Sequence, residues 1–158
     1  MNSLHKRSQK GFTIVELLIV IVIIGILATL VITTYSGIQQ KARNTARVDD
    51  LKALQSQLEA YYAQNSKYPS NTDLGTDSDG NVTFVKANMK GLDPEALKDP
   101  KGTDYSLNVG TTAVANKYSY KATDDSGNTC GSGTDCTKYT LTAKPEGSGA
   151  DIVYTSLN

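Results

Sequence analysis

Histidine, tryptophan and phenylalanine are scarce in this chain of 158 residues. It has one histidine, no tryptophan and two phenylalanines, against nine tyrosines. The histidine, His5, precedes the long apolar run, and the sequence contains neither a GxxxxGK nor an HExxH pattern. The rest of the chain therefore has no histidine-based catalytic dyad or triad, and we expect neither an enzyme nor a cofactor. Two cysteines without a histidine also cannot form a closed zinc site.

Acidic and basic residues balance overall, with 16 of each, but they are unevenly placed. Lys6, Arg7 and Lys10 lie in the first eleven positions, which contain no acid, so the remainder holds 13 basic and 16 acidic side chains. The charges of residues 41–52 alternate in sign, which is typical of a solvated helix face. Charge therefore indicates no nucleic-acid partner.

The longest apolar run of the chain lies in "KGFTIVELLIVIVIIGILATL", residues 10–30, and it continues to Ile32. From Phe12 it spans 21 residues interrupted only by Glu16, which is enough to cross a bilayer as a helix. A secretory signal peptide has a shorter apolar core followed by a small-x-small cleavage site, so that interpretation is disfavoured. The basic residues ahead of the run place the N-terminus in the cytoplasm.

Glu16 is the feature that a plain membrane anchor does not explain. A carboxylate at mid-bilayer costs roughly 2.5–3.5 kcal/mol on insertion scales. One alternative is snorkelling, because Glu16 is only about one turn into the run. The other is a positive charge within a protein assembly, such as a free amine that cleavage after Gly11 would create at Phe12 of a neighbouring subunit.

This stretch resembles the N-terminus of type IV prepilins and of the related pseudopilins of type II secretion. The resemblance covers residues 10 to about 35. It implies that Gly11 precedes the peptidase cleavage site, that Phe12 becomes the N-methylated residue, and that Glu16 pairs with a neighbour's N-terminus. Gly25 and Tyr35 also fall where the family usually has Gly and Tyr, whereas Thr33 stands at the place of a common helix-breaking proline.

The resemblance implies a structural subunit of a type IV pilus, serving adhesion, twitching motility or DNA uptake. Its partners would be the membrane, a prepilin peptidase, the pilus assembly machinery and further copies in a helical filament. The chain would begin in the cytoplasmic membrane and end in an extracellular filament. The alternative is a type II secretion pseudopilin, because "DPKGTDY" (99–105) is similar to a DP-x-G-x-x-Y stretch of major pseudopilins. A single-pass membrane-anchored binding protein is a third possibility.

Beyond Tyr35 an apolar stripe at spacings of three and four predicts that the helix continues as an amphipathic helix to about residue 66. The stripe consists of Ile38, Ala42, Val48, Leu51, Leu54, Leu58 and Tyr61 or Tyr62. The polar residues between them predict a solvated face: Gln39, Lys41, Arg43, Arg47, Asp50, Lys52, Gln57 and Glu59.

From residue 70 the composition predicts short strands at 82–86, 105–109, 117–123, 138–143 and 152–157, and a helical turn at 93–100. The fold class is α+β, a pilin fold with one long helix on a small antiparallel sheet of three or four strands. We expect a cleaved basic leader (1–11), a membrane and filament-core half of the helix (12–35), an amphipathic half (36–66) and a β-rich head (67–158).

Two smaller sites are expected in the head. Cys130 and Cys136 are separated by five residues, three of them Gly or Ser, so a disulfide closes easily and suits an exported domain. Asp77, Asp79 and Asn81 resemble the opening of a calcium loop, but the distal glutamate is missing. A turn before the 82–86 strand is the favoured interpretation there, and we expect no metal.

Overall fold

The structure, a computed structural model, describes residues 11–158, and one long helix opens it. Helix α1 runs without interruption from Ile14 to Asn65, as predicted, and stays α-helical at Thr33 and Gly37. It ends where Ser66 takes up a left-handed conformation with φ 56° and donates its N–H to the carbonyl of Tyr62 at 2.7 Å. The basic leader, residues 1–10, lies outside the described residues.

The described chain divides into two compact units, up to Gln39 and from Gln40 to Asn158. The first unit is the apolar part of α1. Its large apolar side chains from Phe12 to Ile38 are between 48% and 84% exposed. The large apolar side chains of this part of the helix are therefore not buried by other residues that the structure describes.

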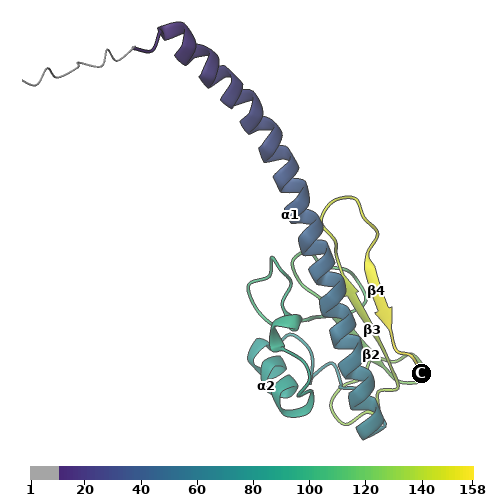
Figure 1. Ribbon diagram of the computed structural model, residues 1–158. Coiled ribbons are helices and arrows are strands. Elements are labelled where there is room, and N and C mark those ends of the chain that lie inside the picture. Colours follow the sequence, from purple (N-terminus) through teal and green to yellow (C-terminus); the bar gives the residue numbers. More distant parts are fainter. Residues whose placement is uncertain (1–10) are drawn as a thin grey trace, which may run out of the picture. The chain divides into compact units, whose positions relative to one another are not determined.

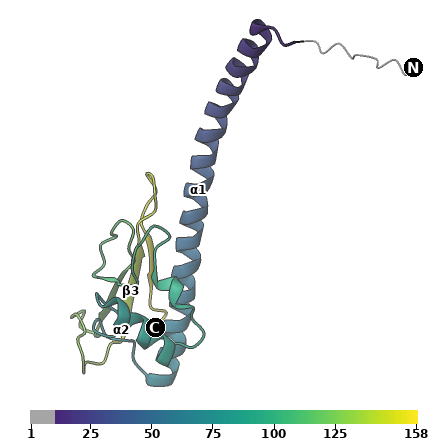
Figure 2. The same cartoon turned by 90° about the vertical axis from the view of Figure 1, so that its left-hand side faces the viewer.

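The second unit contains the rest of α1 and a four-stranded sheet, whose strands run alongside this half of the helix (Figures 1 and 2). The sheet order is β1-β2-β3-β4, with strands at Asn108–Val109, Ser119–Thr123, Lys138–Ala143 and Ile152–Thr155. The β2–β3 and β3–β4 pairs are antiparallel, as expected, whereas the two-residue β1 is parallel to β2. A 3₁₀ turn, η1, covers Pro94–Leu97, where a helical turn was predicted.

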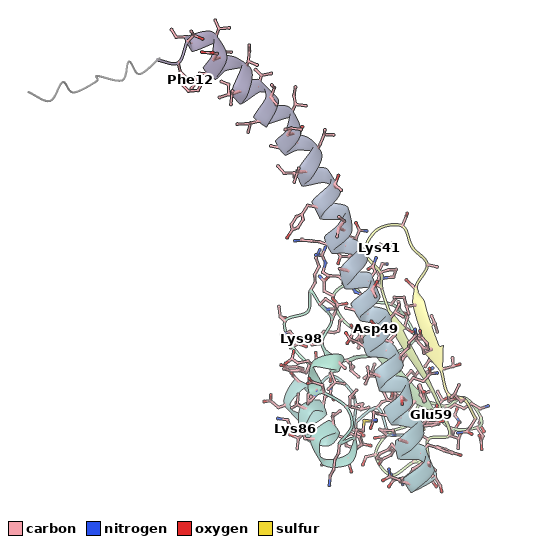
Figure 3. All side chains as sticks on the ribbon, viewed as in Figure 1. Phe12, Lys41, Asp49, Glu59, Lys86 and Lys98 are labelled. Carbon is pink, nitrogen blue, oxygen red and sulfur yellow. The ribbon has the colours of Figure 1, made fainter. Side chains whose placement is uncertain are left out.

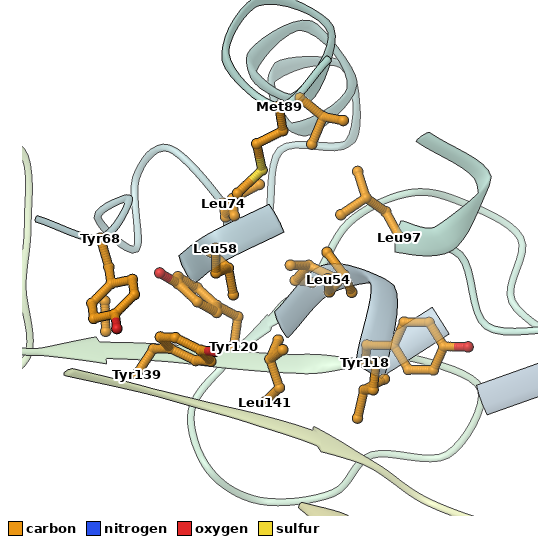
Figure 4. Packing of buried hydrophobic residues seen from close by; sticks show 14 of the residues in the cluster. Leu54, Leu58, Tyr68, Leu74, Met89, Leu97, Tyr118, Tyr120, Tyr139 and Leu141 are labelled. Carbon is orange, nitrogen blue, oxygen red and sulfur yellow. The ribbon is translucent and has the colours of Figure 1, made fainter. Parts of the chain in front are cut away.

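The core forms where α1 crosses the sheet. Leu54 and Leu58 lie between Tyr120 and Leu141 of the sheet and residues such as Met89 on the other side (Figure 4). The apolar residues at every second position of the predicted segments 117–123 and 138–143 are all buried: Tyr118, Tyr120, Ala122, Tyr139, Leu141 and Ala143. Burying apolar surface contributes about 25 cal/mol of free energy per Å², and a shift of one residue in strand pairing would expose these side chains. Their burial therefore fixes the register of the strands.

The strand predicted at 82–86 is wrong, because these residues lie in helix α2, Ser78–Asn88. The β-branched residues in "VTFVK" favour a strand. However, Asn81 and Val85 are the two buried residues of α2, and they are four residues apart. That spacing puts them on one face of a helix. Tertiary packing of this face has overridden the local β-propensity.

Candidate functional site

The first turn of α1 is closed by a capping box of Thr13 and Glu16. The backbone N–H and the hydroxyl of Thr13 donate to Oε2 of Glu16 at 2.9 and 2.7 Å, and the N–H of Glu16 donates to the Thr13 hydroxyl at 3.2 Å. Both bonds from Thr13 end on the same carboxylate oxygen. The other oxygen, Oε1, accepts no hydrogen bond within residues 11–158.

The residues at the predicted cleavage site are open. Phe12 is 84% exposed and lies just before the first turn of the helix (Figure 3). A Cβ added at Gly11 would meet no atom within 4 Å, so the conformation of this unit does not require glycine there. Packing among the described residues therefore does not account for glycine at this position.

The apolar surface that follows is continuous. α1 is the one helix of the described residues that is long and apolar enough to cross a membrane. Its most apolar 18-residue window has a mean hydropathy of 3.1 and is not buried in the structure at all. A surface of this kind requires lipid or other apolar helices around it.

In the globular unit, an ion cluster joins α1 to two loops. Arg47 is fully buried, and its guanidinium donates to both carboxylate oxygens of Asp99 at 2.6 and 2.9 Å. Glu146 accepts from Arg43 at 2.6 and 2.8 Å, from Arg47 at 3.2 Å, and pairs with Lys101 at 2.9 Å. Hydrogen bonds from Arg43 and the other cations hold the pKa of Glu146 well below its usual range.

The solvated face predicted for α1 is therefore wrong at Arg47. This residue lies four positions before Leu51, on the buried face of the helix, where Asp99 and Glu146 pair with it. Asp50 and Glu59, two carboxylates of the predicted solvated face, accept hydrogen bonds from the hydroxyls of buried tyrosines. Asp50 accepts from the Tyr118 hydroxyl at 2.6 Å, and burial raises the pKa of this carboxyl. Each large ring is thus buried while its hydroxyl keeps a partner.

Glu59 is the second of these carboxylates. Its two oxygens accept hydrogen bonds of 2.8 Å from the hydroxyls of Tyr68 and Tyr139. Burial, together with the bond to Glu59, raises the pKa of Tyr68 to about 12. Amphipathic spacing alone gave no signal for these polar contacts.

Cys130 and Cys136 are both buried free thiols in the loop between β2 and β3. Burial and a hydrogen bond with the neighbouring Cys130 raise the pKa of Cys136 to about 12. The loop is anchored through its backbone, since Tyr68 donates to the Cys136 carbonyl at 2.8 Å and Cys130 donates to that of Ala122 at 3.0 Å. The disulfide stays a prediction.

The weak calcium candidates do not converge on an open site. Asp77 precedes α2, Asp79 lies in its first turn, and Asn81 is buried. The Asn81 amide donates to the carbonyls of Gly75 and Tyr105 and accepts from the N–H of Gly75 at 2.9 Å. Across residues 11–158, no group of three or more His, Cys, Asp or Glu side chains lies close enough to hold a metal ion.

Two protein families match this chain. Residues 6–32 match the prokaryotic N-terminal methylation motif, and residues 33–136 match the family described as type IV minor pilin ComP, DNA uptake sequence receptor. The chain belongs to the type IV pilin-like family. The motif implies processing by a prepilin peptidase and assembly by pilus or secretion machinery, and with the apolar helix it fits a membrane-anchored pilin.

Curated relatives of this pilin-like chain bear the name type II secretion system core protein G. The protein from Dickeya chrysanthemi is 36% identical over 112 residues, which cover 65% of this chain and 69% of the relative. The protein from Vibrio cholerae serotype O1 is 32% identical over 151 residues, which cover 92% and 91%. That from Pseudomonas aeruginosa is 34% identical over 125 residues, covering 75% and 87%. No solved structure matches the chain significantly.

Sequence reasoning missed two parts of this pilin-like chain. The capping box could have been predicted from the sequence, because Thr13-Ile-Val-Glu16 is the S/T-x-x-E pattern ahead of an apolar run. The buried pair of Arg47 and Asp99 was not, because the two residues are 52 positions apart and each resembles an ordinary surface charge.

Proposed function

We propose that this pilin-like chain is a non-catalytic filament subunit that is cleaved after Gly11 and N-methylated at Phe12. The match of residues 6–32 to the methylation motif is the observation that carries the proposal. The open conformation at Phe12 and the absence of a folding requirement for glycine at position 11 support it. Residues 12–35 would then form the membrane anchor and later the filament core, followed by the amphipathic half of the helix (36–66) and the head (67–158).

Before assembly, the subunit would lie in the cytoplasmic membrane with its N-terminus inside, as the basic leader favours. In the filament, the apolar side chains of residues 12–32 would pack against those of neighbouring copies. The exposure of these side chains in the single chain supports this, because packing between copies keeps a large apolar surface out of water once the subunit has left the membrane.

Glu16 would hold the register between subunits. Its Oε2 is held by Thr13, while Oε1 is left to accept from the methylated amine of a neighbour's Phe12. In a medium of low dielectric constant an isolated carboxylate and an isolated ammonium are both unfavourable, and each compensates the other when they pair.

Two variants of Glu16 separate this pairing from the capping role. Glu16→Ala removes both the charge and the capping acceptor, whereas Glu16→Gln keeps an acceptor for Thr13 and removes only the charge. We expect both variants to insert in the membrane and both to give few filaments, as measured by electron microscopy and immunoblotting of sheared fractions. Normal filament yield from Glu16→Gln would show that Glu16 serves only to cap its own helix.

The second candidate is a subunit of a type II secretion pseudopilus. It is favoured by the relatives named type II secretion system core protein G and by "DPKGTDY", in which Asp99 forms the buried ion pair. Deletion of the gene in its host distinguishes the two candidates. Loss of sheared extracellular fibres with normal protein export supports a pilus, and loss of export of other proteins supports a pseudopilus.

DNA binding, which the matched family's description names, is not part of the proposal. Residues 40–158 contain slightly more acidic than basic side chains, and several of the basic ones are already engaged with carboxylates. This charge gives little of the phosphate attraction on which DNA affinity depends.

We further propose that Cys130 and Cys136 form a disulfide after export. The two thiols are buried close together in an anchored loop, and exported domains encounter oxidants. Intact mass under non-reducing conditions, before and after alkylation, tests this. A chain that takes up no alkylating agent until it is reduced supports the bond, and a chain that is alkylated twice in the exported filament contradicts it.

A further inference from the structure

A polar cleft of about 380 Å³ lies between the last turns of α1 and the end of α2. Its walls carry four carboxamides, one tyrosine, one lysine and small residues: Gln57, Ala60, Tyr61, Gln64, Asn65, Ala87, Asn88, Lys90 and Gly91. A volume of this size is within the range of small-molecule sites. No residue of this cleft belongs to the N-terminal turn on which filament assembly depends.

The polar groups of the cleft are available to a ligand. The side-chain amides of Gln57 and Gln64 form no hydrogen bond with any residue that the structure describes, although Gln57 is half-buried. Asn65 and Asn88 each donate their N–H₂ to a helix carbonyl, that of Tyr61 and of Phe84 respectively, which leaves their carboxamide oxygens as acceptors. The cleft therefore offers both donors and acceptors with only one formal charge, that of Lys90.

Gly91 shapes the cleft floor. A Cβ at this position would lie 2.6 Å from Nε2 of Gln57, so the absence of a side chain at 91 leaves the Gln57 amide its place in the wall. Any larger residue would force that amide to move.

A second cleft of about 490 Å³ adjoins the first along α2, and both include Ala87 and Asn88. Its other walls carry two hydroxyls, two carboxylates, an aromatic ring and a glycine: Thr72, Asp73, Asp79, Gly80, Thr83 and Phe84. Asp79 and Thr83 form no hydrogen bond through their side chains within residues 11–158. Two carboxylates beside the groove repel a phosphate backbone but accept hydrogen bonds from hydroxyl groups.

We propose that these two clefts, joined at Asn88, bind a neutral oligosaccharide that carries acetamido groups. Sugar hydroxyls donate and accept as carboxamides do, and an acetamido group has one donor and one acceptor to complement Gln57. One ring would lie beside Tyr61 in the first cleft, and the next would reach Asp79 and Thr83 in the second. This goes beyond the proposed filament role, because the site would be complete in a single unassembled chain.

The test uses the full chain in a detergent without a sugar headgroup and titrates it with chitotriose by calorimetry, with maltotriose as the comparison. We expect saturable binding of chitotriose, weaker binding of maltotriose, and a loss of about tenfold or more in affinity for Gln57→Ala, Asn88→Ala and Gly91→Ala. Gln55→Ala is the matched control, because its amide faces β4 and donates to the Thr155 carbonyl at 2.8 Å.

Absence of chitotriose binding at millimolar concentration, with each variant folded as judged by circular dichroism, would overturn the proposal. So would binding that the variants at Gln57 and Asn88 leave unchanged, since the ligand would then lie elsewhere. Binding of a single-stranded DNA 12-mer that the same variants abolish would assign the clefts to nucleic acid instead.

Discussion

At the scale of single residues, Arg47 shows how a charge can become part of a core. It is held by Asp99 on one side and by Glu146 on the other, and its side chain and that of Asp99 are each only 1% exposed. A buried ion pair contributes little net stability compared with an apolar pair, but removing one member leaves the other uncompensated. The pair therefore fixes which loop covers this part of α1.

Asp99→Asn should destabilise the globular unit by about 3–5 kcal/mol, because the buried guanidinium of Arg47 loses its two-bond carboxylate partner and keeps only the longer contact with Glu146 at 3.2 Å. Chemical denaturation of the full chain in detergent, followed by circular dichroism, measures this. The control is Asp135→Asn, whose pair with Lys67 is largely exposed and should contribute about 0–1 kcal/mol. Equal effects of the two variants would show that the Arg47 pair is solvated in solution.

Glu146 makes the stability of the globular unit depend on pH in the acid range. Its folded pKa is lower than the 4.5 of a free glutamate, chiefly because of the hydrogen bonds from Arg43. Its contribution to stability is therefore present above pH 4.5 and is lost as the pH falls toward the folded pKa. Glu146→Gln should lower stability at neutral pH and make the unfolding free energy less sensitive to pH below 4.5. An unchanged slope against pH would contradict this assignment.

At the scale of elements, the periodic segments were predictable and the aperiodic ones were not. α1, β2, β3 and β4 have long apolar stripes or regular alternation, and each formed where the sequence placed it. The prediction at α2 was wrong, because only two of its residues are buried and its segment 82–86 carries β-propensity. The parallel pairing of β1 with β2 could not be predicted, because two residues carry no pattern and the pairing depends on the path of the loop between them.

The candidate sites divide in the same way. Gly11, Phe12 and Glu16 lie in a local motif, so the sequence alone was enough to propose their roles. The partners of Arg47, Asp50 and Glu59 come from distant loops and strands, which no local periodicity reveals.

Loss of an apolar side chain should destabilise the globular unit only when the side chain comes from the second half of α1. Leu54 is fully buried among core residues, so Leu54→Ala should cost the globular unit about 2–5 kcal/mol. Leu27 is 56% exposed, and Leu27→Ala should leave the denaturation midpoint of that unit almost unchanged. The comparison is made on the full chain in detergent micelles, and a similar loss in both variants would contradict the division of α1 at Gln39.

At the scale of the whole molecule, the described residues combine a helix half whose large apolar side chains are exposed with a globular unit that has its own buried core. Both parts match the type IV pilin-like family: residues 6–32 match the methylation motif, and residues 33–136 match the minor-pilin family. Because this half of the helix is exposed, we propose that the functional state is an assembly. Cleavage after Gly11 would then be the step that allows the chain to assemble.

The most direct measurement of this claim is the intact mass, with N-terminal sequencing, of the protein purified from membranes of its own host. Removal of residues 1–11 from the 158-residue chain predicts 147 residues that begin with N-methyl-Phe12. A chain that still carries Met1 to Gly11, in cells with a working prepilin peptidase, would contradict the account and leave a plain membrane anchor in which Glu16 only caps its own helix.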